Sequence, residues 1–108
     1  YDGDTFRATI KGWPDIIGER IPVRVNGIDT PELRGKCKSE ITLARQAKQV
    51  TVEFLRSAKV IELKNIKRGK YFRIIADVYG DGKSLSDELL SAGFAFKYNG
   101  GKKQSWCK

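Results

Sequence analysis

The chain has 108 residues, of which 40% are hydrophobic, and its formal net charge is +8. This length suffices for one core, so we expect a single domain over residues 1–108. No apolar run approaches the roughly 20 residues of a membrane span, and the positive charge favours nucleic acid over a membrane as the anionic partner.

The chain contains no histidine. Mechanisms that need an imidazole as a base, nucleophile or metal ligand are therefore excluded. Any hydrolytic chemistry would have to rely on carboxylates, arginines and a metal ion. The lysines and arginines are concentrated in the second half of the chain and the carboxylates in the first half, so an anionic partner would meet a basic surface that also carries acids. The alternative is a basic surface that only confers solubility.

The first part of the chain predicts two strands. Apolar residues alternate from Thr5 to Ile10 and again from Arg20 to Val25, and the second alternation places Arg24 on the outer face, away from the core. Glycine, proline and aspartate in residues 11–18 indicate a hairpin connection between the two strands. Asn26-Gly27 is a strong turn signal after the second strand.

A helix is predicted in the middle of the chain. Apolar residues recur at three- and four-residue steps from Leu43 to Ala58, which is the pattern of an amphipathic helix ending near Ser57. Ser39 or Thr42 is the candidate N-cap, because a hydroxyl there can accept a backbone N–H of the first turn.

The second half predicts further strands. Alternating residues from Val60 to Ile66 and from Tyr71 to Tyr79 indicate two of them, and Gly80-Asp81-Gly82 is a hairpin signal. Phe94-Ala95-Phe96 is a short apolar segment that could form a fifth strand.

A short helix is predicted between the strand that ends at Tyr79 and the apolar segment that begins at Phe94. It is expected from Ser84 to Ala92, with Ser84 or Ser86 as the cap and Gly93 as the terminator. The whole pattern predicts a mainly β, α+β fold, namely a five-stranded OB-fold barrel with two or three packed helices.

The two cysteines, Cys37 and Cys107, do not have the spacing of metal ligands. Both lie in polar segments, Gly-Lys-Cys-Lys and Ser-Trp-Cys-Lys, that we expect to be exposed. We favour a disulfide over two free surface thiols. Closing so long a loop would stabilise the fold by on the order of 4 kcal/mol in the chain-entropy model.

Four polar segments are candidates for chemistry: Asp2-Gly3-Asp4-Thr5, Arg24, Asp29-Thr30-Pro31-Glu32 and Lys70-Tyr71-Phe72-Arg73. The two acidic segments could meet at one site for a hard cation, which takes roughly six to eight oxygen ligands in loose geometry. The planar guanidiniums of the arginines suit the binding of a phosphate.

This set, in its order and approximate spacing, resembles the staphylococcal nuclease (thermonuclease) family, and the resemblance extends from residue 1 to about residue 98. It implies a calcium-dependent nuclease that hydrolyses phosphodiester bonds of DNA, with RNA as a second candidate substrate. The resemblance also implies low sequence specificity and 3′-phosphate ends. We expect a monomer without a membrane partner. Together with the expected disulfide, the resemblance predicts a secreted or periplasmic protein.

The resemblance implies a metal site and a residue that acts on water. Asp4 and Asp29 correspond to the carboxylates that hold Ca²⁺, with the backbone carbonyl of Thr30 as a further ligand. Asp2 corresponds to an accessory acid near that site. Glu32 resembles the residue proposed to activate the attacking water.

The remaining roles concern the substrate. Arg24 and Arg73 resemble the two guanidiniums that bind the scissile phosphate and stabilise its additional charge. Lys70 and Tyr71 resemble nucleotide-contacting residues, and Tyr98 resembles an aromatic residue that stacks on a base.

Several alternatives remain open from the residues alone. The main alternative function is a non-catalytic OB-fold module that binds single-stranded nucleic acid through charge and aromatic rings. Arg73 could pair with Asp77 or Asp81 in place of a phosphate. The Lys102-Lys103 run is expected to be solvated charge with a diffuse attraction to phosphate, and Trp106 is expected to be a packing residue.

Overall fold

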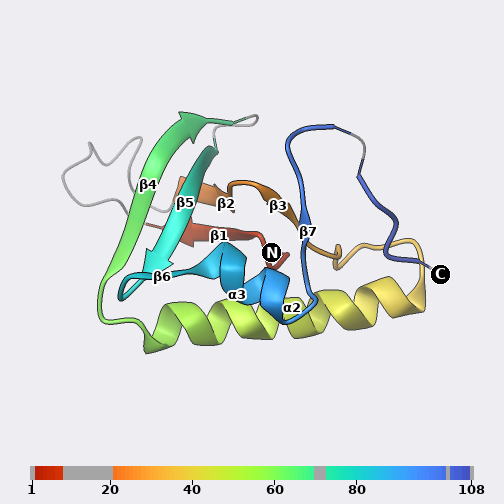
Figure 1. The fold of residues 1–108 in the computed structure, drawn as a ribbon. Helices are drawn as coiled ribbons and strands as arrows, with labels where there is room; N and C mark the ends of the chain where they lie inside the picture. The colour runs from red at the N-terminus through yellow and green to blue at the C-terminus, as the bar shows by residue number, and fades with distance from the viewer. Residues whose placement is uncertain (1, 9–20, 70–72, 102, 108) are drawn as a thin grey trace.

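The computed structural model describes residues 2–8, 21–69, 73–101 and 103–107, with elements labelled as in Figure 1. None of the helices in these ranges is long and apolar enough to cross a membrane. The elements in chain order are β1 (Thr5–Ala8), β2 (Ile21–Val25), β3 (Ile28–Asp29), α2 (Lys38–Ser57), β4 (Ile61–Arg68), β5 (Ile74–Gly80), β6 (Lys83–Ser84), α3 (Leu85–Ser91) and β7 (Phe96–Lys97).

Most of the strands form one sheet with the order β1-β2-β5-β4, and β6 pairs with β5. The pairing of β2 with β5 is parallel and the others are antiparallel. The strands β3 and β7 form a separate two-stranded antiparallel sheet. The predicted mainly β fold with packed helices is confirmed. A closed barrel is not seen in the described ranges, because no pairing there joins β1 to β4.

The helices cover the apolar face of the sheet. Figure 1 shows α2 running beneath the strands, and α3 contacts both α2 and β5. β5 alternates strictly between buried and partly exposed residues, and its Ile74 and Ala76 lie in register with Val23 and Val25 of β2. The helices contribute buried residues to the same core: Ala47, Leu85 and Leu89.

The start of α2 differs from the prediction. Its N-cap is Cys37, which makes no side-chain cap hydrogen bond, so the expected caps Ser39 and Thr42 are wrong. The buried Glu40 in the first turn provides an acceptor instead, because its carboxylate accepts the backbone N–H of Lys36 at 3.0 Å. A carboxylate at this position therefore satisfies a donor that precedes the helix.

The predicted ends of α3 and the hairpin before it are confirmed. The Ser84 hydroxyl accepts the backbone N–H of Asp87 at 3.3 Å, and Gly93 ends the helix with φ +80°. Between β5 and β6, Asp81 and Gly82 form a two-residue turn with φ values of +51° and +82°. This left-handed backbone is the one that Asp-Gly tolerates in tight hairpins.

The short strands were not predicted correctly. β3 and β6 span two residues each, which is too short for an alternation to be recognised. β7 lies at Phe96–Lys97 and not across Phe94 to Phe96, because its partner β3 selects the residues that pair. Three predicted strand ends, Ile10, Arg20 and Tyr71, lie outside the described residues.

The C-terminal segment is attached at two points. Cys37 and Cys107 form the expected disulfide, with their Cα atoms 6.0 Å apart. The Trp106 ring stacks on Phe96 with a centroid distance of 4.0 Å, so Trp106 is a packing residue as expected. In Figure 1 the segment after β7 returns toward the loop that precedes α2.

Candidate functional site

Three segments meet at one end of β1. Thr5 lies opposite Arg24 in the antiparallel pairing of β1 with β2, and the Asp4 carbonyl accepts the Val25 N–H at 2.8 Å. Asp4 and Thr30 are joined twice: the Asp4 N–H donates to the Thr30 hydroxyl, and the Thr30 N–H donates to the Asp4 carboxylate, each at 3.2 Å. The structure therefore brings together the two predicted acidic segments, whose Asp4 and Asp29 are 25 positions apart in the chain.

Arg24 lies between two buried carboxylates. Its Nη2 is 3.5 Å from Oδ2 of Asp4 and 3.9 Å from Oδ1 of Asp29, and all three residues are buried. Arg24 occupies the predicted outer face of β2, but that face is covered. The Tyr98 ring lies 5.6 Å from the guanidinium carbon, and β3 carries Asp29 alongside. Tyr98, predicted to contact a base, is thus part of the same cluster.

The cluster contains oxygen donors of the kind that a hard cation takes. Burial raises the pKa of the Asp4 carboxyl above its usual value, although Arg24 and the Thr30 amide act in the opposite direction. A carboxylate that is desolvated in this way gains from an additional positive charge. The candidate donors are all oxygens, namely the carboxylates of Asp4 and Asp29 and the carbonyl of Thr30, which fits Ca²⁺.

Lys103 also reaches the carboxylates. Its Nζ lies 3.3 Å from Oδ1 of Asp29 and 3.6 Å from Oε1 of Glu32. Burial lowers the pKa of Lys103, but Asp29 and Glu32 outweigh it, so the pKa lies above its ordinary value. The expectation that Lys103 is solvated charge is wrong, because the attached C-terminal segment brings it over the site. Lys102 lies outside the described residues.

The loop that carries Glu32 is held by two other acids. The carboxylate of Asp2, predicted to be an accessory acid, accepts the Leu33 N–H at 2.7 Å. Glu40 accepts the backbone N–H of Glu32 at 3.2 Å, as well as that of Lys36. The sequence reasoning missed Glu40. The feature of the sequence that could have indicated Glu40 is its position as an acid in the first turn of the predicted helix.

Small residues let the N-terminal segment approach α2. A Cβ added to Gly3 would lie 3.0 Å from the Cβ of Ala47, which is closer than such atoms normally approach. The Gly3 carbonyl accepts the Thr51 hydroxyl of the same helix at 2.6 Å. Because Gly3 lies between Asp2 and Asp4, this contact places both acids beside α2.

Arg73 lies on the same side of the sheet as Arg24. β5 runs parallel to β2 with Ile75 beside Arg24, and Arg73 precedes Ile75 by two residues. Residues two apart along a strand share a face, so Arg73 would lie about 7 Å further along it. The predicted partners Lys70 and Tyr71 lie outside the described residues, as does Phe72.

The Arg73 Nε is a buried donor without a hydrogen-bond partner in the described ranges. Its two alternative partners are engaged elsewhere. Asp77 accepts hydrogen bonds from the amides of Asn26 and Asn65, and Asp81 accepts backbone N–H groups of the connection between α2 and β4. Among the described residues, neither forms an ion pair with Arg73. A buried donor of this kind is suited to an anion such as phosphate.

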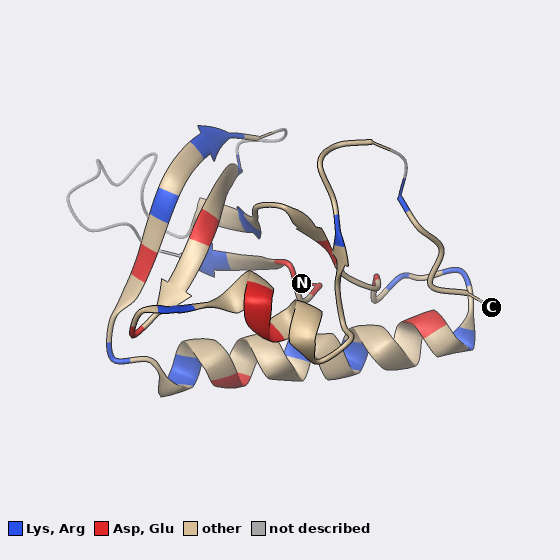
Figure 2. Ribbon diagram, viewed as in Figure 1, with Lys and Arg blue, Asp and Glu red and all other residues tan. Residues whose placement is uncertain are grey.

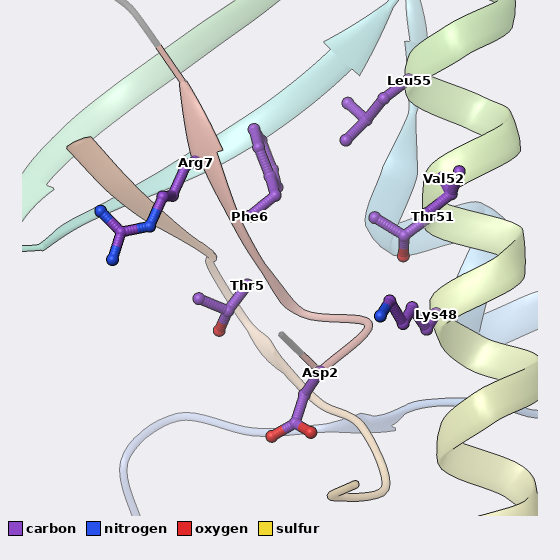
Figure 3. Close-up of a pocket in the computed structure, with 8 residues that line it drawn as sticks. All are labelled: Asp2, Thr5, Phe6, Arg7, Lys48, Thr51, Val52 and Leu55. Atoms are coloured by element: carbon purple, nitrogen blue, oxygen red, sulfur yellow. The ribbon is translucent and has the colours of Figure 1, made fainter. Parts of the chain in front are cut away.

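A separate pocket of about 290 Å³ lies between β1 and α2. Figure 3 shows Asp2 at one end of it and the side chains of Phe6 and Leu55 at the other. The atoms exposed in it are mostly apolar, and none of the predicted catalytic residues lines it, so it is part of the packing between β1 and α2. The lining residues are Asp2, Thr5, Phe6, Arg7, Lys48, Thr51, Val52 and Leu55.

Comparison with known proteins finds a family model and relatives that match this chain. A family model described as staphylococcal nuclease homologue matches residues 22–106. The SPbeta prophage-derived endonuclease YokF of Bacillus subtilis (strain 168) is 36% identical over 96 residues, which cover 87% of this chain and 30% of YokF. Endonuclease YncB of the same organism is 34% identical over 96 residues, which cover 87% of this chain and 43% of YncB. The chain thus spans less than half the length of these relatives.

Proposed function

This chain belongs to the staphylococcal nuclease family, and on that premise we propose that it is a calcium-dependent endonuclease. It hydrolyses phosphodiester bonds of DNA, and RNA is a further candidate substrate. Cleavage has low sequence specificity and leaves 3′-phosphate ends. The observation that carries the proposal is the buried cluster in which the Arg24 guanidinium lies 3.5 Å from Asp4 and 3.9 Å from Asp29. One cluster then offers carboxylates to a metal and positive charge to a phosphate.

The two arginines bind and neutralise the scissile phosphate. Arg24 is pre-positioned, because two carboxylates and the Tyr98 ring hold its guanidinium in place. Arg73 has a buried Nε available for a phosphate oxygen. A planar donor of fixed charge in a desolvated position stabilises developing negative charge better than a mobile ammonium.

The carboxylates divide between two tasks. Asp4 and Asp29 would hold Ca²⁺ together with the Thr30 carbonyl, and Asp2 keeps the neighbouring loop in place. When bound, Ca²⁺ would supply positive charge to the phosphate and lower the pKa of a bound water. Glu32, whose side chain is 51% exposed, can reach a solvent molecule and orient it for in-line attack.

The substrate would cross a basic face of the sheet. Lys67 of β4 pairs with Ile75, which lies beside Arg24, so Lys67 and Arg24 share a face. Arg7 of β1 lies on this face as well, two residues from Thr5. Figure 2 shows basic segments on β1, β2 and β4. The strand register, not the sequence, brings these cations together, and their attraction to phosphate would be independent of base sequence.

A second pocket suits the base next to the scissile bond. It has a volume of about 430 Å³ and offers side-chain amide, carboxylate and hydroxyl groups beside the Tyr98 ring. Stacking on an aromatic ring contributes to nucleotide binding without strong base selectivity. The lining residues are Asn26, Gly27, Ile28, Asp77, Ser86, Leu90, Lys97, Tyr98 and Asn99.

Digestion of single-stranded DNA tests the proposal. We expect cleavage with Ca²⁺, none with a chelator, and a rate lower by about 10² to 10⁴ for Glu32→Gln, because the water loses its orienting base. Glu62→Gln is the matched control, since Glu62 is an exposed carboxylate on β4, and it should cleave like the wild type. Labelling of the product ends before and after phosphatase treatment reports whether the phosphate remains at the 3′ end.

Two outcomes would contradict the proposal. Cleavage that survives both chelation and Glu32→Gln would exclude the metal-and-carboxylate mechanism. Binding of single-stranded DNA without cleavage under any metal would favour the non-catalytic binding module.

A further inference from the structure

The C-terminal segment from Tyr98 to Cys107 is attached on both sides of Lys103. Before it, the Tyr98 N–H donates to the Gly27 carbonyl at 2.9 Å. After it, Trp106 stacks on Phe96, and Cys107 is bonded to Cys37 in the loop before α2. Lys103 therefore cannot diffuse far from the site, whichever way its side chain points.

The Lys103 ammonium occupies a position between two carboxylates of the proposed catalytic site. Asp29 is almost completely buried, with 6% of its side chain exposed, whereas Glu32 is half exposed. The Nζ lies 3.3 Å from the first and 3.6 Å from the second. The same Oδ1 of Asp29 already faces Arg24 at 3.9 Å, so two cationic side chains share one carboxylate oxygen.

Resting on the calcium-dependent function proposed above, we propose that Lys103 is a built-in competitor for the divalent cation and sets the affinity of the site for it. Without the cation, the ammonium neutralises Asp29 and Glu32. When the cation binds, Lys103 gives up both ion pairs and moves away from the carboxylates. The site then binds its cation more weakly than the same acids would without Lys103.

The side chain of Lys103 is suited to such an exchange. Lysine carries a compact charge on a flexible four-carbon stem, and 46% of this side chain is exposed, so the ammonium can swing into solvent. The attached backbone keeps the ammonium at a high effective concentration near the carboxylates. Even when displaced, it remains close enough for its charge to repel a divalent cation.

Calorimetric titration of the whole chain with Ca²⁺, in the absence of nucleic acid, tests the competition. Lys103→Gln should bind Ca²⁺ about three- to tenfold more tightly than the wild type, a range that corresponds to one or two partly exposed ion pairs. Lys59→Gln is the matched control, because it removes one positive charge from an exposed residue that follows the C-terminal end of α2, whereas the segment of Lys103 is bonded to Cys37 before the helix. Its Ca²⁺ affinity should equal that of the wild type.

The possible results separate the competition from the proposed function. Equal or weaker Ca²⁺ binding by Lys103→Gln, with clear binding by the wild type, overturns the competition and leaves the nuclease proposal intact. If neither the wild type nor Lys103→Gln binds Ca²⁺, both the calcium-dependent function and the competition by Lys103 are overturned. If Lys59→Gln binds Ca²⁺ as much more tightly as Lys103→Gln does, the cause is the lower net charge of the protein, and the competition by Lys103 is overturned.

Reduction tests whether the disulfide keeps Lys103 in place. With dithiothreitol, the Ca²⁺ affinity of the wild type should rise toward that of Lys103→Gln, whereas Lys103→Gln should not change. Circular dichroism of the reduced proteins confirms that the fold is retained at the titration temperature. If reduction changes the Ca²⁺ affinity of both proteins equally, the disulfide acts on the carboxylates without Lys103. That result would contradict the role of the disulfide in keeping Lys103 in place.

Discussion

At the scale of single residues, Glu40 shows how a side chain outside the predicted site can shape it. It is buried at the start of α2 and accepts the backbone N–H groups of Glu32 and Lys36. Gly35 allows the loop to pass close by, since a Cβ there would lie 2.6 Å from the Glu40 side chain. Glu40 therefore holds the loop that presents Glu32.

Replacing Glu40 tests this positioning role. Glu40→Ala leaves two backbone donors without their acceptor, so we expect a loss of about 1–3 kcal/mol in the free energy of unfolding. The rate of DNA cleavage should fall because Glu32 is no longer held, while DNA affinity should change little. Denaturant unfolding, initial rates and DNA binding measure these effects.

Glu53→Ala is the control for that prediction, because Glu53 lies on the exposed side of the same helix. Glu40→Gln, which retains one acceptor oxygen, should restore part of the cleavage rate. A Glu40→Ala protein that cleaves like Glu53→Ala would contradict the positioning role.

At the scale of elements, the turn between β5 and β6 holds the connection between α2 and β4. The Asp81 carboxylate accepts the Lys59 N–H at 3.0 Å and the Val60 N–H at 2.9 Å. The Val60 and Lys59 amides hold the pKa of Asp81 below its ordinary value. One side chain thus links a hairpin to the end of a helix that precedes it by more than 20 residues.

This link predicts a dependence of stability on pH. The pKa of Asp81 is lower in the folded protein than in the unfolded chain. Its carboxylate therefore adds to the free energy of unfolding at pH values above the unfolded pKa of about 3.9, and this contribution is lost as the pH falls through the folded pKa. Asp81→Asn tolerates the same left-handed turn but cannot ionise. We expect the wild type to melt at a higher temperature than Asp81→Asn above about pH 5, with the difference shrinking below pH 4.

Thermal unfolding of both proteins between about pH 2.5 and 7 measures this difference, and Glu62→Gln serves as the reference for an exposed carboxylate. A difference between the wild type and Asp81→Asn that is independent of pH would show that the Asp81 charge does not stabilise the turn.

At the scale of the whole molecule, the disulfide joins segments 70 positions apart. It attaches the C-terminal segment, whose Lys103 reaches Asp29, to the loop before α2, which carries Glu32. We propose that the protein works in an oxidising compartment, as a secreted or periplasmic protein. The disulfide supports this, because such bonds persist where thiols are not kept reduced.

Reduction of the disulfide should lower the stability of the whole chain. The chain-entropy model gives about 4 kcal/mol for a loop of this length, because the unfolded chain regains conformations that the bond excludes. Denaturant unfolding with and without dithiothreitol measures the change, and intact mass confirms the gain of two hydrogens. A protein isolated from its natural source with both cysteines reduced would contradict the proposed compartment.

Much of this protein is determined by local sequence. The alternation in β2 and β5, the helical period of α2, the serine cap of α3 and the Asp-Gly turn all depend on neighbouring residues, so they can be predicted from the chain itself. The candidate residues for metal and phosphate binding also stand out by type and order. The absence of histidine limits their chemistry however the chain folds.

The tertiary structure decided which residues meet. The pairing of β3 with β7, the covering of Arg24, the hydrogen bonds of Glu40 and the ion pairs of Lys103 each join segments that no local pattern connects. The physical reason is that a buried charge or donor takes the partner that the fold brings within reach, and that partner can come from anywhere in the chain. The sequence therefore indicated the candidate residues of the site, whereas packing determined which side chains hold it, cover it and pair with its carboxylates.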